Sequence, residues 1–295
     1  MSLAIVGSSG GLKGVFVQGV LNAFEAEGFF ADAYAGSSAS ALPALSAAGK
    51  LCNLVGLRYW QRVVERLRQK GSDLSEVMWT VTQEWRTSPE LSRHSLFQPG
   101  APRLFIPVNF VKNAQAAVQT QGKQARRLGR TLLLAIARRD RQWIEDNLQL
   151  HLFDSQAPPE HAHRLTPDNV FDVAFASTRM IHWKIPAWVE GKPYVDASYT
   201  CACPVVELLV YGYQKIIVVA TEIGALYRSI VADQVIPEII DNVPIYVVRP
   251  GTDLKDIGVD YTECTDEGLL AVFRHGEERG REFLAQWKHV FSANE

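Results

Sequence analysis

The sequence predicts a three-layer α/β/α protein in which a mostly parallel central sheet lies between helices. Short apolar runs alternate with amphipathic stretches, the pattern of a sheet covered by helices. Two turns rich in Gly and Ser each follow an apolar run and precede a helical pattern. The chain has 295 residues, 47% of them hydrophobic and 21% charged, which suits one large globular domain. We therefore expect a single domain over residues 1–295.

The first elements can be assigned from short patterns. Leu3 to Val6 is the first expected strand. Residues 14–27 carry apolar side chains close to helical spacing, and Gly28 follows as a stop signal. A second strand is expected over residues 30–35. Residues 38–48, rich in small side chains, are expected to form the next helix.

The remaining chain is expected to add a helical insertion and three strands. Residues 51–128 are mainly helical in pattern, apart from a Pro-bearing loop around residues 99–107, and are predicted to be an insertion or cap on the sheet. A C-terminal helix is predicted over residues 265–291. The later strands are expected at residues 131–137, where a helix is the alternative, 215–220 and 244–248.

Charge and apolar runs limit the partners and the location. The formal net charge of −2 argues against nucleic acid as an obligate partner. No apolar run approaches the roughly 20 residues of a spanning helix, and the start lacks the pattern of a secretion signal. These features favour a cytoplasmic protein. Residues 58–70 and 126–141 mix cations with Trp or aliphatic residues. Each segment is either an ordinary solvated face or a site of peripheral contact with anionic lipid.

The cysteines indicate neither a disulfide scaffold nor a metal site. Four cysteines are too few and too scattered for a scaffold. Cys201 and Cys203 lack a second Cys or His pair at matching spacing, which a tetrahedral site requires. We expect buried thiols near a strand end, and no metal or cofactor.

The turn at residues 36–40, Gly-Ser-Ser-Ala-Ser, has the pattern of a nucleophile elbow. Such an elbow places a serine at the apex of a strained strand-to-helix turn, with very small residues two positions before and after it. Ser38 meets this requirement through Gly36 and Ser40. The amides and the positive dipole end of the following helix favour an oxyanion beside it. The alternative is an ordinary helix N-cap at Ser37 or Ser38.

A second Gly-rich turn, residues 7–14 (GSSGGLKG), also joins a strand to a helix. Its spacing is neither that of a Walker loop nor G-x-G-x-x-G. If the two strands are neighbours, both turns emerge at the same sheet edge, where open α/β folds bind ligands. The amides of Gly10 and Gly11 are then expected to face Ser38.

Together, three ordered motifs resemble those of the patatin-like phospholipases. The G-G-G-x-R/K-G loop of that family is matched by residues 9–14, and its G-x-S-x-G elbow by residues 36–40. Its later D-G-G/A motif is matched by Asp196-Ala-Ser198, which follows the segment from Phe175 to Pro186. The resemblance extends roughly from Leu3 to Val219.

This resemblance implies a serine acyl hydrolase, a phospholipase or lipid esterase, that acts on lipid or simple acyl esters. Ser38 is the implied nucleophile and Asp196 its base, with an acyl-enzyme intermediate. Gly10, Gly11 and Lys13 are the implied oxyanion-binding residues. Three departures, Ser9, Ser40 and Ala197 in place of family glycines, leave a weakened or non-hydrolytic lipid-binding protein as an alternative.

Histidines define the remaining alternative, an α/β-hydrolase with a Ser-His-Asp triad. His275 and His289 lie in the predicted closing helix, where a catalytic histidine is not expected. His182 is expected in the wall of the substrate pocket, with Ala39 beside the nucleophile. Trp183 fits an acyl channel and core packing about equally well.

Overall fold

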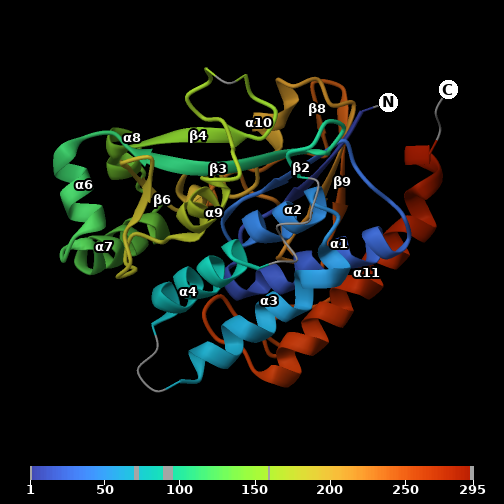
Figure 1. The fold of residues 1–295 in the computed structure, drawn as a ribbon, viewed down its shortest axis with the longest axis horizontal. Helices are drawn as coiled ribbons and strands as arrows, with labels where there is room; N and C mark the ends of the chain where they lie inside the picture. Colours follow the sequence, from blue (N-terminus) through green and yellow to red (C-terminus); the bar gives the residue numbers. More distant parts are fainter. Residues whose placement is uncertain (1, 70–72, 89–95, 159, 293–295) are drawn as a thin grey trace.

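One mixed β-sheet forms the centre of the molecule (Figure 1). The computed structural model describes residues 2–69, 73–88, 96–158 and 160–292. Along the sheet the strand order is β5-β6-β3-β2-β1-β7-β9-β8, and β4 also pairs with β3. The strands are β1 (Leu3–Gly7), β2 (Ala33–Gly36), β3 (Arg103–Val111), β4 (Leu148–Asp154), β5 (Ala187–Val189), β6 (Lys192–Val195), β7 (Lys215–Val219), β8 (Ile239–Ile240) and β9 (Val243–Val248).

The centre of the sheet is parallel, which confirms the predicted fold class. β1 pairs in parallel with β2 and β7, and these pair in parallel with β3 and β9. All five residues of β1 are buried, as expected for a parallel strand covered on both faces. Antiparallel pairs add β4, β5, β6 and β8 outside this centre.

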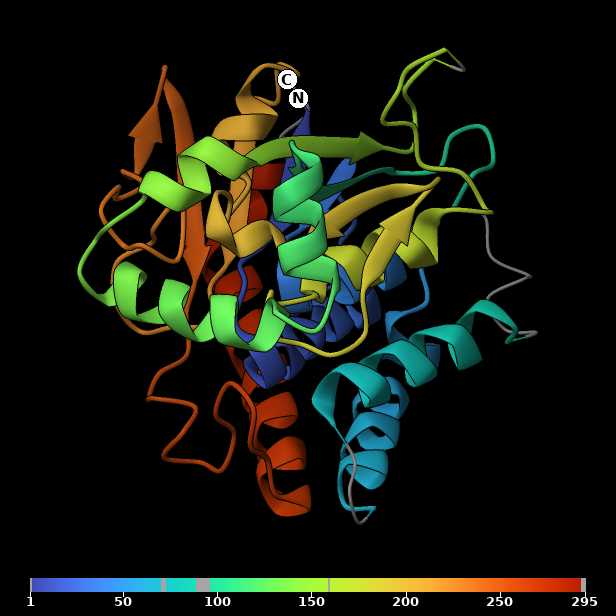
Figure 2. The ribbon, with the colours of Figure 1, turned by 90° about the vertical axis from the view of Figure 1, so that its left-hand side faces the viewer.

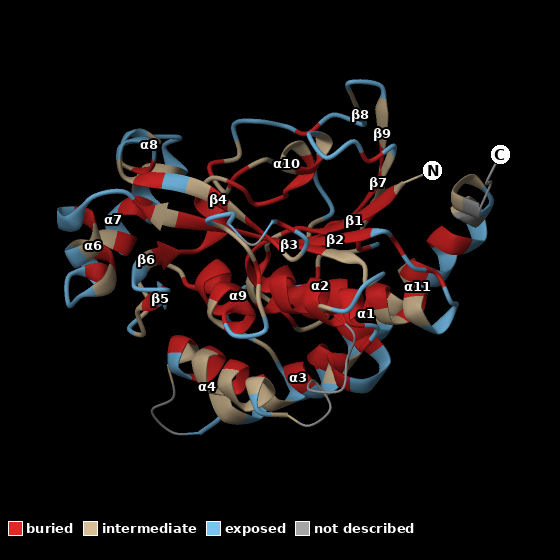
Figure 3. Ribbon diagram, turned by 45° about the horizontal axis from the view of Figure 1, so that its top comes forward, coloured by how far each residue is buried: buried red, intermediate tan, exposed pale blue. Residues whose placement is uncertain are grey.

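The two faces of the sheet are covered unequally. The helices α1, α2, α9 and α11 pack on one face, and α3 and α4 lie outside them on the same side (Figures 1, 2 and 3). The other face is covered by α10 and long loops. The helices are α1 (Gly14–Ala26), α2 (Ala41–Ala48), α3 (Cys52–Leu67), α4 (Leu74–Arg86), α6 (Ala114–Gln121), α7 (Ala125–Ala137), α8 (Gln142–Asn147), α9 (Val170–Thr178), α10 (Val205–Leu209) and α11 (Asp266–Ser292).

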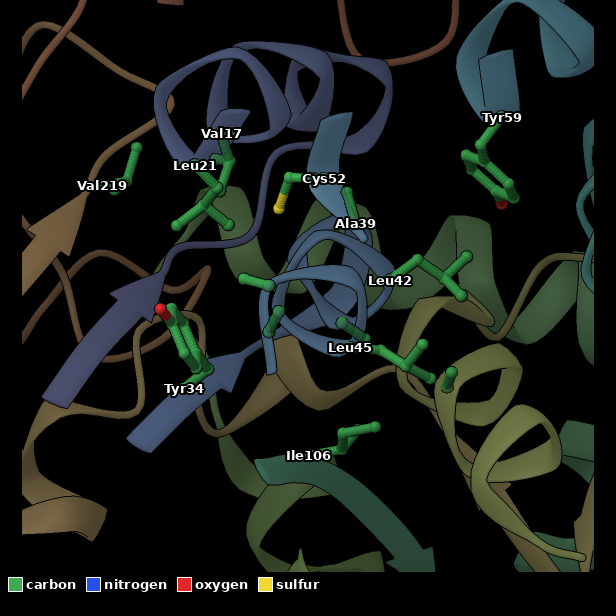
Figure 4. Packing of buried hydrophobic residues seen from close by; sticks show 14 of the residues in the cluster. Val17, Leu21, Tyr34, Ala39, Leu42, Leu45, Cys52, Tyr59, Ile106 and Val219 are labelled. Atoms are coloured by element: carbon green, nitrogen blue, oxygen red, sulfur yellow. The ribbon is translucent and has the colours of Figure 1, made fainter. Parts of the chain in front are cut away.

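The main core lies between the sheet and the helices of the first face. Tyr34 of β2 and Val219 of β7 contribute to the same buried cluster as Leu42 and Leu45 of α2 (Figure 4). The predicted closing helix is present as α11, which packs closely along α1. A Cβ at Gly19 of α1 would lie 2.1 Å from the carbonyl oxygen of Phe273, so this contact requires glycine.

The predicted helical insertion over residues 51–128 needs a correction. The region expected as a Pro-bearing loop contains most of β3, a central strand of the sheet. Pro107 lacks an amide donor, and it lies beyond Phe105, the last residue that β2 pairs with. The strand therefore continues through this proline, and only the segments on either side of β3 are helical.

The strand expected at residues 131–137 was also wrong, because this segment belongs to α7. The buried residues of α7 are Ala125, Gly129 and Leu132, at spacings of four and three, which is the period of a helix lying on a surface. None of the helices within the described ranges has the length and apolarity to cross a bilayer.

Candidate active site

Ser38 sits at a strained turn between β2 and α2. A short 3-10 turn, η2 (Ser38–Ser40), begins immediately after Ser37. The backbone of Ser38 has φ of +53°, a left-handed conformation that costs a non-glycine residue about 1 kcal/mol or more. At Gly36 a Cβ would lie 2.0 Å from the carbonyl oxygen of Ser40, so the turn needs glycine there. This is the local geometry expected of an elbow.

The neighbouring serines use their hydroxyl groups to hold the turn. The Ser37 hydroxyl donates to the carbonyl of Cys201 at 2.5 Å. The Ser40 hydroxyl donates to the carbonyl of Ser8 at 2.6 Å, which ties the elbow to the loop after β1. Ser40 also has φ of −87°, so the glycine usual in this motif is not needed for its backbone. Of these three hydroxyl groups, only that of Ser38 contacts an ionisable side chain.

Ser177, near the end of α9, holds the backbone of the elbow through a hydrogen bond. Its hydroxyl accepts a hydrogen bond from the amide of Ser38 at 3.0 Å and donates to the carbonyl of Pro107 at 2.8 Å. The strained residue is thereby connected to β3. The sequence contained Ser177 within the motif before Pro186, but its contact with Ser38 spans 139 positions and has no local signal.

Asp196 lies directly beside Ser38. The Ser38 Oγ donates to Asp196 Oδ2 at 2.8 Å, and Oδ1 accepts from the Ser198 amide at 2.7 Å. Asp196 caps the 3-10 turn η3 (Ala197–Tyr199) after β6, and its own amide donates to the carbonyl of Arg179 at 2.8 Å. Asn109 of β3 donates to the carbonyl of Asp196 at 2.6 Å. Both the carboxylate and the backbone that carries it are therefore fixed.

Burial gives Asp196 the properties of a base near neutral pH. The side chain is fully buried, and burial raises its pKa to about 6, against the lowering effect of the hydrogen bonds from Ser198 and Ser38. A carboxylate with such a pKa is mostly ionised at pH 7 and accepts a proton more readily than an exposed aspartate. Ala197 has no left-handed φ, so its Cβ does not strain the turn.

No histidine takes part in this pair within the described residues. The His275 Nε2 accepts from the amide of Gly251 at 2.9 Å, away from Ser38. His182 lines the cavity beside the site, and burial, followed by the charge of Arg179, lowers its pKa. His289 lies near the end of α11. The geometry does not favour the Ser-His-Asp alternative.

The loop after β1 presents backbone amides beside the pair. No acceptor is recorded, in the part of the chain that the structure describes, for the amides of Gly10, Gly11 and Ala39, and all three residues line the same cavity as Ser38. Gly11 has φ of +57°, and a Cβ there would lie 2.3 Å from the carbonyl of Tyr261. Ser9 fixes the loop through two hydrogen bonds. Its amide donates to the carbonyl of Ala202 at 2.8 Å, and its carbonyl accepts from the hydroxyl of Thr221 at 2.6 Å.

Lys13 occupies a different position from the one expected. Its ammonium group pairs with Glu222 at 2.9 Å and Asp253 at 3.4 Å, lies 4.6 Å from the centre of the Tyr261 ring, and is absent from the cavity lining. Burial lowers the pKa of Lys13, but the hydrogen bonds and charges of Glu222 and Asp253 outweigh this and raise it. The long side chain reaches partners more than 200 positions away. The position of Lys13 suits holding the glycine loop and does not suit binding an oxyanion.

The pair opens into a cavity of about 800 Å³. Ala39, His182 and Trp183, the three residues expected in the pocket, all line it. The helices α3, α4 and α7 supply apolar side chains to its wall, through Trp60, Leu74, Met78, Leu133 and Ile136. Among the described lining residues there is no lysine or arginine, and the carboxylates are Asp196 and Glu222. No group of three or more metal-ligating side chains is found in the described ranges.

The fold and site define a serine–aspartate pair, with a Gly-rich amide loop, at the carboxyl edge of a parallel sheet. No protein-family model matches the chain, and no curated protein matches its sequence. Among solved structures, the crystal structure of VipD from Legionella pneumophila is similar to this chain, with a TM-score of 0.46 and 10% sequence identity. The match covers 97% of this chain and 67% of the VipD chain.

Substitution of Gly10 tests the role of the amide loop. A Cβ at Gly10 would lie 2.6 Å from Thr221 Oγ1, which holds the carbonyl of Ser9, so Gly10→Val should displace the loop. We expect kcat on an acyl ester to fall about a hundredfold with little change in KM, because an oxyanion donor acts on charge that appears only in the transition state. Gly251→Ala is the control, since its added Cβ would make only ordinary contacts. A raised KM with unchanged kcat would instead mark the loop as a binding element for the ground state.

Proposed function

We propose that the chain is a serine acyl hydrolase of the patatin-like phospholipase type, which cleaves carboxylic esters of lipids. The observation that carries this proposal is the 2.8 Å hydrogen bond from Ser38 to a fully buried aspartate at an apolar cavity. A serine hydroxyl needs a proton acceptor within this distance to attack an ester carbonyl at neutral pH. The three motifs that resemble this family contribute the serine, the aspartate and the amide loop.

The proposed reaction proceeds through an acyl-enzyme. Ser38 Oγ attacks the ester carbonyl while Asp196 Oδ2 takes its proton. The amides of Gly10, Gly11 and Ala39, which have no recorded acceptor among the described residues, are then available to the oxyanion. The tetrahedral intermediate collapses, and the leaving alcohol takes the proton from Asp196. Water then attacks the acyl-serine while Asp196 takes its proton, and collapse of this second tetrahedral intermediate releases the fatty acid and returns the proton from Asp196 to Ser38 Oγ.

The cavity suits the acyl chain of such a substrate. Its wall is built largely of aliphatic and aromatic side chains, and it is as large as a typical pocket for a small molecule. The described lining carries no cationic side chain to bind a phosphate, so the enclosed part of the substrate is the uncharged acyl group. Burial lowers the pKa of His182, which favours its neutral form in the cavity wall.

A series of p-nitrophenyl acyl esters tests this function. We expect the wild-type protein to hydrolyse them, with kcat/KM rising as the acyl chain lengthens. Each added methylene that is buried in the cavity should stabilise the bound transition state by up to roughly 0.8 kcal/mol. A lipid-binding protein without hydrolytic activity would leave every chain length intact. That result would contradict the proposal.

A further inference from the structure

The helix α7 and the two residues after it carry an unusual amount of positive charge. Five arginines in this segment are exposed, and residues 125–139 contain no acidic side chain. The arginines are Arg126, Arg127, Arg130, Arg138 and Arg139. No ion pair of theirs is recorded in the described part of the chain. By contrast, Arg141 pairs with Asp233 and Glu145, so five neighbouring cations are left to face solvent.

Exposed leucines lie among these cations. Leu134 is 65% exposed and Leu133 is 42% exposed. Leu134 is four positions from both Arg130 and Arg138, so the three side chains lie on one face of α7. Such a face offers a lipid–water interface both an apolar side chain that can leave water and long cationic side chains that can reach the headgroups.

The opposite face of α7 is fixed against the rim of the cavity. Gly129 approaches His182 so closely that a Cβ would lie 2.6 Å from its backbone nitrogen. Leu133 and Ile136 line the cavity. The helix lies at one end of the molecule beside α6, with exposed turns (Figures 1 and 3). Its charged face therefore adjoins the space proposed for the acyl chain.

We propose that α7 docks the chain onto a lipid surface that carries anionic headgroups. The arginines supply the electrostatic attraction, and Leu134 enters the boundary between the headgroups and the acyl chains. The positive charge of these arginines favours an anionic surface. Because Leu133 lines the cavity proposed for the acyl chain, the surface is expected to be one that also contains acyl chains. The docking through the arginines and Leu134 goes beyond ester hydrolysis and does not depend on it, whereas the role given to the adjoining cavity rests on the proposed function.

Sedimentation with vesicles of ether-linked lipids tests this proposal, because these lipids contain no ester that the protein could cleave. The wild-type chain should sediment with vesicles that contain phosphatidylserine, and bind vesicles of phosphatidylcholine alone at least tenfold more weakly. In the triple variant Arg126→Gln, Arg127→Gln, Arg130→Gln, binding to the anionic vesicles should fall by on the order of a hundredfold. None of these three arginines lines the cavity, so hydrolysis of a soluble short-chain ester should be unchanged.

A matched variant separates a local effect from net charge. Lys192, Arg274 and Arg281 are exposed cations on other elements, and their replacement by glutamine changes the net charge by the same amount. This control should lose less than threefold in binding. If it loses as much as the α7 variant, or if the α7 variant binds like the wild type, the proposal is wrong.

Leu134 provides an independent test of the apolar contact. Leu134→Ser should weaken binding to anionic vesicles about tenfold, because a leucine contributes roughly 1.5 kcal/mol or more when it leaves water. Val210→Ser is the control, since Val210 is 83% exposed near α10. Wild-type binding that is equal on neutral and anionic vesicles, or absent from both, would overturn the docking proposal and leave the ester hydrolysis untouched.

Discussion

Replacement of Asp196 by asparagine is expected to lower kcat on an acyl ester by on the order of 10⁴-fold. The substitution keeps the shape of the side chain but removes the carboxylate that accepts the proton of Ser38. In the wild type, Ser38 Oγ lies 2.8 Å from Asp196 Oδ2. The amide oxygen can still accept from the amide of Ser198. Steady-state kinetics on a p-nitrophenyl ester measure the effect.

The same variant should be more stable than the wild type at neutral pH. Asp196 has a folded-state pKa of about 6 against an ordinary value of 3.8, so about 2 units at about 1.4 kcal/mol each give on the order of 3 kcal/mol. Because the folded pKa is raised, the wild type loses this stability as the pH rises from about 4 through about 6. The advantage of the asparagine variant should therefore be largest at about pH 7.5 and smaller at about pH 5.

Denaturant unfolding at the two pH values measures this difference. His182→Gln, at another cavity residue, is the control and should not reproduce the pH-dependent gain. An asparagine variant that is inactive and also less stable at neutral pH would mean that the substitution damages the site instead of removing a base.

Replacement of Ser38 by alanine should lower kcat by on the order of 10⁵- to 10⁶-fold, because it removes the elbow hydroxyl that donates to Asp196 Oδ2. The loss of stability should stay at about 1–3 kcal/mol, the cost of removing one hydrogen-bond donor from a buried carboxylate, because the apolar core is unchanged. Ser38→Gly should be equally inactive but more stable than Ser38→Ala by about 1 kcal/mol, because glycine adopts the left-handed φ without strain.

Calorimetry on the two Ser38 variants checks the strain, and ester turnover checks the chemistry. Ser37→Ala is the matched control: it removes a structural hydrogen bond to Cys201 and should retain activity within about tenfold. Equal stability of the glycine and alanine variants would show that the elbow stores no strain. Residual turnover in both variants would show that the nucleophile is a residue other than Ser38.

Those parts of the site that depend on neighbouring residues could be predicted from the sequence. Gly36, Ser38 and Ser40 occupy one turn, and the space that a Cβ would fill at Gly36 is occupied by the chain four residues later. The loop at Gly10 and Gly11 follows β1, whose four consecutive apolar residues, Leu3 to Val6, indicate a buried parallel strand. In both cases the signal is local.

Other parts depend on contacts between distant segments. Asn109 donates to the carbonyl of Asp196 and lies in β3, a strand whose first part was predicted to be a loop because it contains Pro107. Ser177 acts on a residue 139 positions away. The three consecutive leucines at 132–134 resembled a buried strand, although only Leu132 is buried. Lys13 was assigned by the resemblance, and its flexible side chain is directed by Glu222 and Asp253 from the far end of the chain.

The pH profile alone would not distinguish a dyad from a triad. An acidic limb near pH 6 fits Asp196, and it lies close to the ordinary pKa of histidine, about 6.5. Single substitutions of His182, His275 and His289 are therefore needed beside Asp196→Asn. If the limb remains near pH 6 in all three histidine variants, it belongs to the carboxylate.

The most direct measurement of the central claim is the mapping of a fluorophosphonate adduct by peptide mass spectrometry. The Ser38–Asp196 dyad predicts one adduct, on Ser38, in the wild type and in each of the three histidine variants, and strongly slowed labelling in Asp196→Asn. An adduct on Ser37 or Ser40 would contradict the assignment of the elbow. A histidine variant that labels as slowly as Asp196→Asn would contradict the dyad itself.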